Sequence, residues 1–110
     1  MNTKIPTNKK LLVQFRLEPG CLGPDGVDHI ANFCAFAQKK IGQINAEFIR
    51  CELIPRFDKS LAEIEYSILG KRLNESQVTK YLKSFNQELS DLKELLDEQI
   101  ALLIEQYFNR

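Results

Sequence analysis

The chain has 110 residues, of which 44% are hydrophobic, 27% charged and 9% aromatic, a composition typical of one globular domain. This composition excludes a disordered chain, a collagen-like chain and a small scaffold held together by disulfides. Fifteen basic and fifteen acidic side chains cancel to a formal net charge of zero, so no whole-molecule attraction for nucleic acid or for an anionic membrane surface is expected.

The first predicted element is a strand. Residues 1–10 are polar and rich in lysine, and we expect them to form a flexible leader before a single α+β domain over 11–110. Every second residue from Leu11 to Leu17 is apolar, which is the pattern of a half-buried strand. Pro19 and Gly20 then end this strand.

A helix is predicted next, over residues 25–41. Asp25 and Asp28 at its start and Lys39 and Lys40 at its end suit the helix dipole. Its apolar residues recur at intervals of three and four, as in a helix with one buried face: Val27, Ile30, Cys34, Ala37 and Ile41.

Two further strands are predicted over residues 46–54 and 62–68, because both segments alternate between apolar and polar positions. Pro55 ends the first of them and Gly70 ends the second. Residues 55–60 are expected to connect the two strands as a hairpin.

The last segment, 74–108, contains neither glycine nor proline and predicts a long helix, although one helix and two both remain open. Asn74 and Gln77 have the spacing of a capping box. One continuous helix would be roughly 50 Å long, more than a domain of this size spans. Its far end is therefore expected to pack on a second copy; the alternative is a break near Gln99 and packing within one subunit.

The expected contact between copies is the apolar end of this helix. A homodimer, or contact with another protein, would cover these side chains, because monomers avoid exposed apolar patches of this kind. The residues expected in the interface are Leu96, Ile100, Leu103, Ile104, Tyr107 and Phe108.

The order strand–helix–strand–strand–helix predicts an α+β fold with a three-stranded antiparallel sheet and two helices. This order resembles the ferredoxin-like split βαβ topology without its last strand. The likeness is one of topology alone and implies no function.

The candidate catalytic residues are Cys21, in the glycine-rich segment before the first predicted helix, and His29, in the second turn of that helix. A helix N-terminus lowers a thiol pKa, whereas the carboxylates of Glu18, Asp25 and Asp28 oppose that effect. The glycine spacing matches neither a P-loop nor a dinucleotide-binding pattern, so no cofactor is expected.

A metal site is the second candidate. Cys21, His29, Cys34 and Cys51 supply four zinc-ligand side chains, but their spacing lacks the paired C-x-x-C of zinc sites. Cys34 and Cys51 also lie on apolar faces, where a thiol acts as a small hydrophobic group. The expectation is therefore no bound metal.

Three cysteines, an odd number, and no recognisable signal peptide predict reduced thiols in the cytoplasm. No apolar run approaches the roughly eighteen residues of a membrane span. The sequence favours a non-catalytic interaction or regulatory module that self-associates. The alternatives are a dimer that binds a small molecule between sheet and helix, and a thiol enzyme that uses Cys21 and His29.

Overall fold

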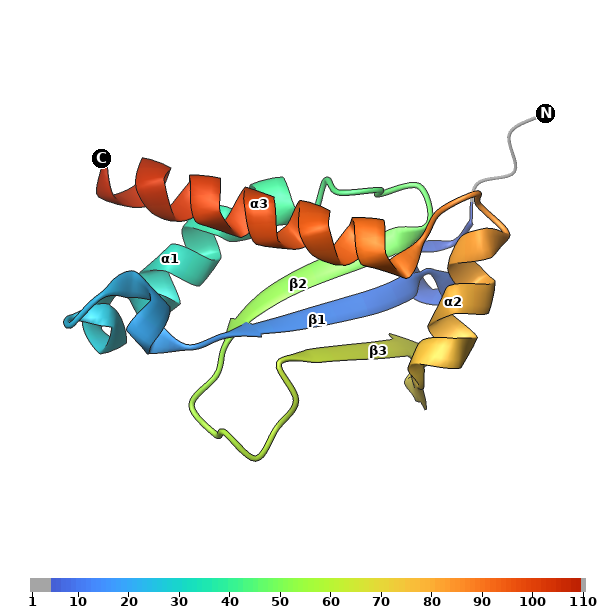
Figure 1. The fold of residues 1–110 in the computed structure, drawn as a ribbon, viewed down its shortest axis with the longest axis horizontal. Coiled ribbons are helices and arrows are strands. Elements are labelled where there is room, and N and C mark those ends of the chain that lie inside the picture. Colours follow the sequence, from blue (N-terminus) through green and yellow to red (C-terminus); the bar gives the residue numbers. More distant parts are fainter. Residues whose placement is uncertain (1–4, 110) are drawn as a thin grey trace.

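The computed structural model describes residues 5–109. The elements in chain order are the short 3-10 helix η1 (Thr7–Lys9), β1 (Leu11–Leu17), the 3-10 helix η2 (Pro19–Leu22), α1 (Gly26–Ile41), β2 (Ile49–Pro55), β3 (Ile64–Ile68), β4 (Lys71–Leu73), α2 (Glu75–Lys83) and α3 (Leu89–Phe108). Figure 1 shows their arrangement. Within the predicted leader, residues 1–4 lie outside the described part, and Thr7–Lys9 form the 3-10 turn.

The α+β class is confirmed, but the predicted three-stranded antiparallel sheet is wrong. The sheet has four strands in the order β2-β1-β3-β4. β1 pairs with β2 in parallel, whereas β3 is antiparallel to both β1 and β4. β4 was not predicted, because three residues are too few to show an alternating pattern.

The predicted hairpin between the second and third strands is also wrong, since β1 lies between β2 and β3. α1 returns the chain to the start of a neighbouring strand, so β1, α1 and β2 form a βαβ unit with adjacent parallel strands. The ferredoxin-like topology does not apply, because its split βαβ unit leaves room for another strand between these two.

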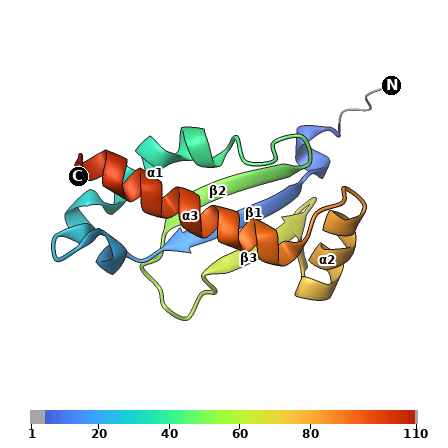
Figure 2. The same cartoon turned by 45° about the horizontal axis from the view of Figure 1, so that its top comes forward.

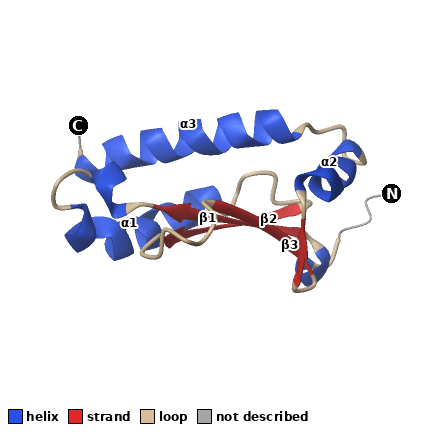
Figure 3. Cartoon of the chain, turned by 60° about the horizontal axis from the view of Figure 1, so that its bottom comes forward, coloured by secondary structure: helices blue, strands red, loops and turns tan. Residues whose placement is uncertain are grey.

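One face of the sheet is buried beneath the helices. Along β1 the alternate residues Leu11, Val13, Phe15 and Leu17 are buried, as their period-two pattern predicts. α3 runs along this face as a separate layer, with α1 toward β2 and α2 across one end of the sheet (Figures 2 and 3). The core therefore lies between the sheet, α1 and α3.

The outer edge of β2 is covered by a side chain of α1. The Gln38 amide nitrogen donates a hydrogen bond to the Cys51 carbonyl at 2.8 Å, and its amide oxygen accepts one from the Leu53 N–H at 2.9 Å. Two backbone groups that an additional strand would use are thus satisfied within the chain.

The segment 74–108 forms two helices, α2 and α3, and the break lies before Leu89 rather than near Gln99. The predicted capping box is confirmed, since Asn74 and Gln77 exchange side-chain and backbone hydrogen bonds of 2.9 Å. α2 ends in a Schellman motif, in which Asn86 takes the left-handed conformation with φ 59°.

Two backbone hydrogen bonds define this motif: the Gln87 N–H donates to the Leu82 carbonyl and the Asn86 N–H to the Lys83 carbonyl. The bend brings Phe85 into a parallel stack with Phe48, with ring centroids 4.5 Å apart. α3 alone spans about 30 Å at 1.5 Å per residue, within the 46 Å long axis of the molecule. The last helix is therefore not longer than the domain, and the reason for expecting a dimer contact through its far end no longer applies.

Candidate functional site

A hollow that combines apolar walls with charged groups lies between the carboxyl end of β1 and α3. Its volume is about 350 Å³. It is lined by Phe15, Arg16, Leu17, Glu18, Cys21, Glu63, Asp97, Ile100, Ala101 and Ile104. We call it the β1–α3 hollow.

The walls of the β1–α3 hollow are apolar and its charged groups are mostly acidic. Glu18 is paired with Arg56 at 2.7 Å, and Arg16 is paired with Glu65 at 2.9 Å. Among the described residues, no cation pairs with the carboxylates of Glu63 or Asp97, which both line the hollow. The hollow therefore suits an apolar group that carries a positive charge.

The backbone beside the hollow requires a glycine at position 26. A Cβ on Gly26 would lie 1.7 Å from the Pro19 carbonyl oxygen, so no other residue fits without a shift of the backbone. This close approach packs the start of α1 against η2. It thereby fixes Cys21, the third residue of η2, at the hollow.

The two candidate catalytic residues, Cys21 and His29, have different surroundings. Cys21 is exposed and lines the β1–α3 hollow. The His29 ring instead packs edge-on against Phe108 at 5.2 Å and against Tyr107 at 6.0 Å. None of the interactions found among residues 5–109 joins the Cys21 thiol to the His29 imidazole.

The other two residues considered as metal ligands, Cys34 and Cys51, are free thiols in the core. Burial raises the pKa of Cys34 to about 11 and that of Cys51 to about 12. Both thiols are therefore protonated near neutral pH. Within the described part of the chain, no group of three or more His, Cys, Asp or Glu residues could hold a metal ion.

The six residues expected in an interface divide into two sets. Leu96, Ile100 and Leu103 are buried within the chain's own core. Ile104, Tyr107 and Phe108 are partly buried and pack against that core. The apolar end of the long helix is thus largely covered by α1 and the sheet.

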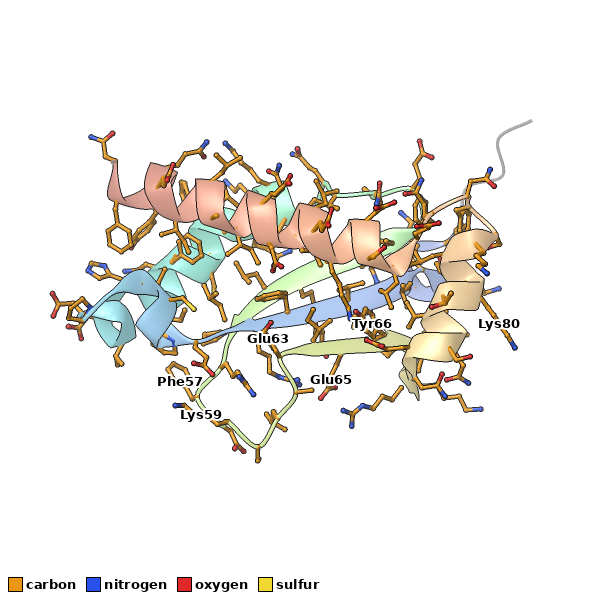
Figure 4. The ribbon with its side chains drawn as sticks, in the orientation of Figure 1. Phe57, Lys59, Glu63, Glu65, Tyr66 and Lys80 are labelled. Atoms are coloured by element: carbon orange, nitrogen blue, oxygen red, sulfur yellow. The ribbon has the colours of Figure 1, made fainter. Side chains whose placement is uncertain are left out.

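A second feature, which the sequence pattern did not reveal, adjoins the β1–α3 hollow. Residues 56–63 connect β2 to β3, and we call them the 56–63 loop. The last residue of this loop, Glu63, lines the hollow. Phe57 and Leu61 are 69% and 43% exposed on this loop. Figure 4 shows Phe57 and Lys59 on the loop, away from α3.

Arg56 makes hydrogen bonds across the loop. Its guanidinium donates hydrogen bonds to the carbonyls of Leu61 and Lys59 and to the Glu18 carboxylate. At the loop tip, Asp58 accepts hydrogen bonds from the backbone N–H and the hydroxyl of Ser60, and these bonds lower the pKa of Asp58. The exposed Phe57 is therefore carried by an ordered segment.

Comparison with protein-family models, with curated proteins and with solved structures found no match for this chain. Within the described residues, none of the helices has both the length and the apolar character needed to cross a membrane.

Proposed function

We propose that the chain is a cytosolic, non-catalytic interaction module that forms a homodimer through the 56–63 loop and the β1–α3 hollow. In this dimer, Phe57 of each copy enters the hollow of the other. The arrangement replaces the helical contact that the sequence favoured.

The observation that carries the proposal is the Arg56 hydrogen-bond network, which holds an exposed aromatic side chain in place. An ordered loop loses little conformational freedom on binding, so its apolar contacts contribute more fully to affinity. Buried aromatic residues are also the commonest anchors of interfaces. The net charge of zero leaves no overall repulsion between two copies.

Charge complementarity favours a second copy as the occupant. Lys59 lies two residues from Phe57 on the loop, and Glu63 and Asp97 provide unpaired carboxylates at the hollow. Because loop and hollow adjoin on one end of the molecule, reciprocal insertion about a two-fold axis gives a closed dimer.

Sedimentation equilibrium over a wide range of protein concentration tests the proposal. Phe57→Ser should weaken dimerisation, whereas Leu69→Ser should not, because Leu69 is 63% exposed but lies at the β3–β4 turn. Lys59→Glu and Asp97→Lys should each weaken association, and their equimolar mixture should recover part of it. A monomeric wild-type chain at millimolar concentration would contradict the proposal.

A second candidate function is the binding of a small apolar amine in the same hollow, supported by its volume and its unpaired carboxylates. Phenethylamine is a suitable probe, and methyl resonances of Ile100 and Ile104 report on its binding. Specific shifts of these methyls in a chain that stays monomeric would favour this candidate over the dimer. Asp97→Asn should then reduce the affinity.

A further inference from the structure

Arg50, on β2, forms no ion pair with any carboxylate of residues 5–109. Arg16 and Arg72 are both paired with Glu65, and Arg56 is paired with Glu18. No described residue accepts a hydrogen bond from the Arg50 guanidinium, and its Nε is buried with no partner at all. An unsatisfied buried donor is costly, so a missing acceptor needs an explanation.

A second hollow, distinct from the β1–α3 hollow, lies beside Arg50. It has a volume of about 360 Å³ at the outer edge of β2, and we call it the β2-edge hollow. It is lined by Thr7, Lys10, Gln38, Gly42, Ala46, Ile49, Arg50, Cys51 and Glu52. Three elements and two connecting segments of the first half of the chain thus meet here.

The charges around the β2-edge hollow are two cations and one carboxylate. The Lys10 ammonium donates a hydrogen bond to the Ala46 carbonyl but has no carboxylate partner. Glu52 is the opposing charge, and its carboxylate accepts a hydrogen bond from the Gln14 amide at 3.3 Å. One positive charge therefore remains uncompensated.

We propose that the β2-edge hollow binds the phosphate group of a small molecule. The planar guanidinium of Arg50 presents paired N–H donors that match the oxygens of a phosphate. The Lys10 ammonium supplies a second positive charge, and the Thr7 hydroxyl supplies a neutral donor. The volume exceeds that of a phosphate ion, which leaves room for the group that carries it.

Titration of the full chain with inorganic phosphate, at constant ionic strength and pH, tests this proposal by ¹H–¹⁵N NMR. We expect saturable shifts of the Arg50 side-chain Nε–H and of the backbone amides of Gly42 and Ala46. Sodium chloride at equal ionic strength should produce no saturable shift, and acetate should bind more weakly than phosphate.

Two variants and a matched control locate the site. Arg50→Gln should weaken phosphate binding about tenfold or more, since a hydrogen-bonded charge partner is lost. Lys10→Gln should weaken it several-fold. Arg72→Gln, which removes an exposed arginine paired with Glu65 on β3, should leave the affinity unchanged.

Several results would overturn the proposal. These are shifts that do not saturate, an affinity that Arg50→Gln leaves intact, and acetate binding as tight as that of phosphate. If Arg50→Gln does not fold, Lys10→Gln and the map of wild-type shifts decide the question. Because the two hollows share no lining residue, failure here leaves the proposed dimer contact standing, and the reverse also holds.

Discussion

The Tyr81 hydroxyl on α2 donates a hydrogen bond of 2.6 Å to the carbonyl of Phe48, the residue that precedes β2. The same oxygen accepts a hydrogen bond of 3.3 Å from the Leu11 N–H at the start of β1. One side chain of the second half of the chain therefore connects the beginnings of both parallel strands.

Tyr81→Phe should lower the free energy of unfolding by about 1 kcal/mol, because the part-buried Phe48 carbonyl loses the shorter of its two hydrogen bonds and keeps only that from the Leu11 N–H at 3.2 Å. Urea denaturation followed by circular dichroism measures this change. Ser84→Ala is a suitable control, since its hydroxyl only donates to the Tyr81 carbonyl on the helix surface. Equal stability of the Tyr81→Phe and Ser84→Ala variants would contradict this role.

Arg56→Ala should release the 56–63 loop, because the backbone carbonyls of Lys59 and Leu61 lose their donor. We expect faster amide hydrogen exchange in the loop and a loss of about 1–3 kcal/mol in the free energy of unfolding. Arg72→Ala should cost less than about 0.5 kcal/mol, since its ion pair with Glu65 is exposed.

The contrast between the two arginines rests on burial, with side-chain exposures of 18% for Arg56 and 68% for Arg72. Unchanged exchange rates in the loop of Arg56→Ala would show that other contacts order it. The dimer proposal would then lose its principal support.

Asn86→Gly should stabilise the protein, whereas Asn86→Ala should destabilise it by about 1 kcal/mol. The reason is that the C′ position of the Schellman motif has positive φ, which glycine adopts freely and alanine does not. Thermal denaturation of the two variants provides the comparison. A stabilising alanine at position 86 would mean that α2 and α3 become one continuous helix.

The buried thiols predict a loss of stability at high pH. The pKa values of Cys34 and Cys51 in the folded chain are about 11 and about 12, against an ordinary value of 9.0. Above pH 9 the unfolded chain releases thiol protons that the folded chain keeps, so unfolding becomes more favourable as pH rises. This contribution is complete below pH 9 and is lost progressively as the pH approaches these folded values.

Urea denaturation at several pH values between 8 and 11 measures this dependence. The double variant Cys34→Ala/Cys51→Ala serves as the comparison, and its stability should fall less steeply across the same range. Identical slopes for the two proteins would assign the pH dependence to other groups.

The local elements of the fold were largely predictable because they depend on nearby residues. Alternation located β1, β2 and β3, and the capping box marked the start of α2. The pairing of strands was not predictable, since an alternating pattern does not specify the neighbouring strand. The break after α2 was missed because Asn86 occupies the left-handed position that glycine usually marks.

The candidate sites were harder to predict, for a related reason. Cys21 lines the β1–α3 hollow, whereas His29, eight residues later in the sequence, packs against aromatic rings of α3. Arg56 and Glu18 are 38 residues apart in the sequence. The importance of Arg50 lies in the partner that it lacks, and no sequence pattern carries that information.

The two edge strands of the sheet, β2 and β4, are protected in different ways from pairing with a strand of another molecule. Gln38 saturates part of the β2 edge, and the opposite edge is a strand of three residues that carries Lys71 and Arg72. Short, positively charged edges discourage the pairing of strands between molecules. Growth of the sheet into fibrils is thereby opposed at both edges, even though zero net charge provides no repulsion between copies.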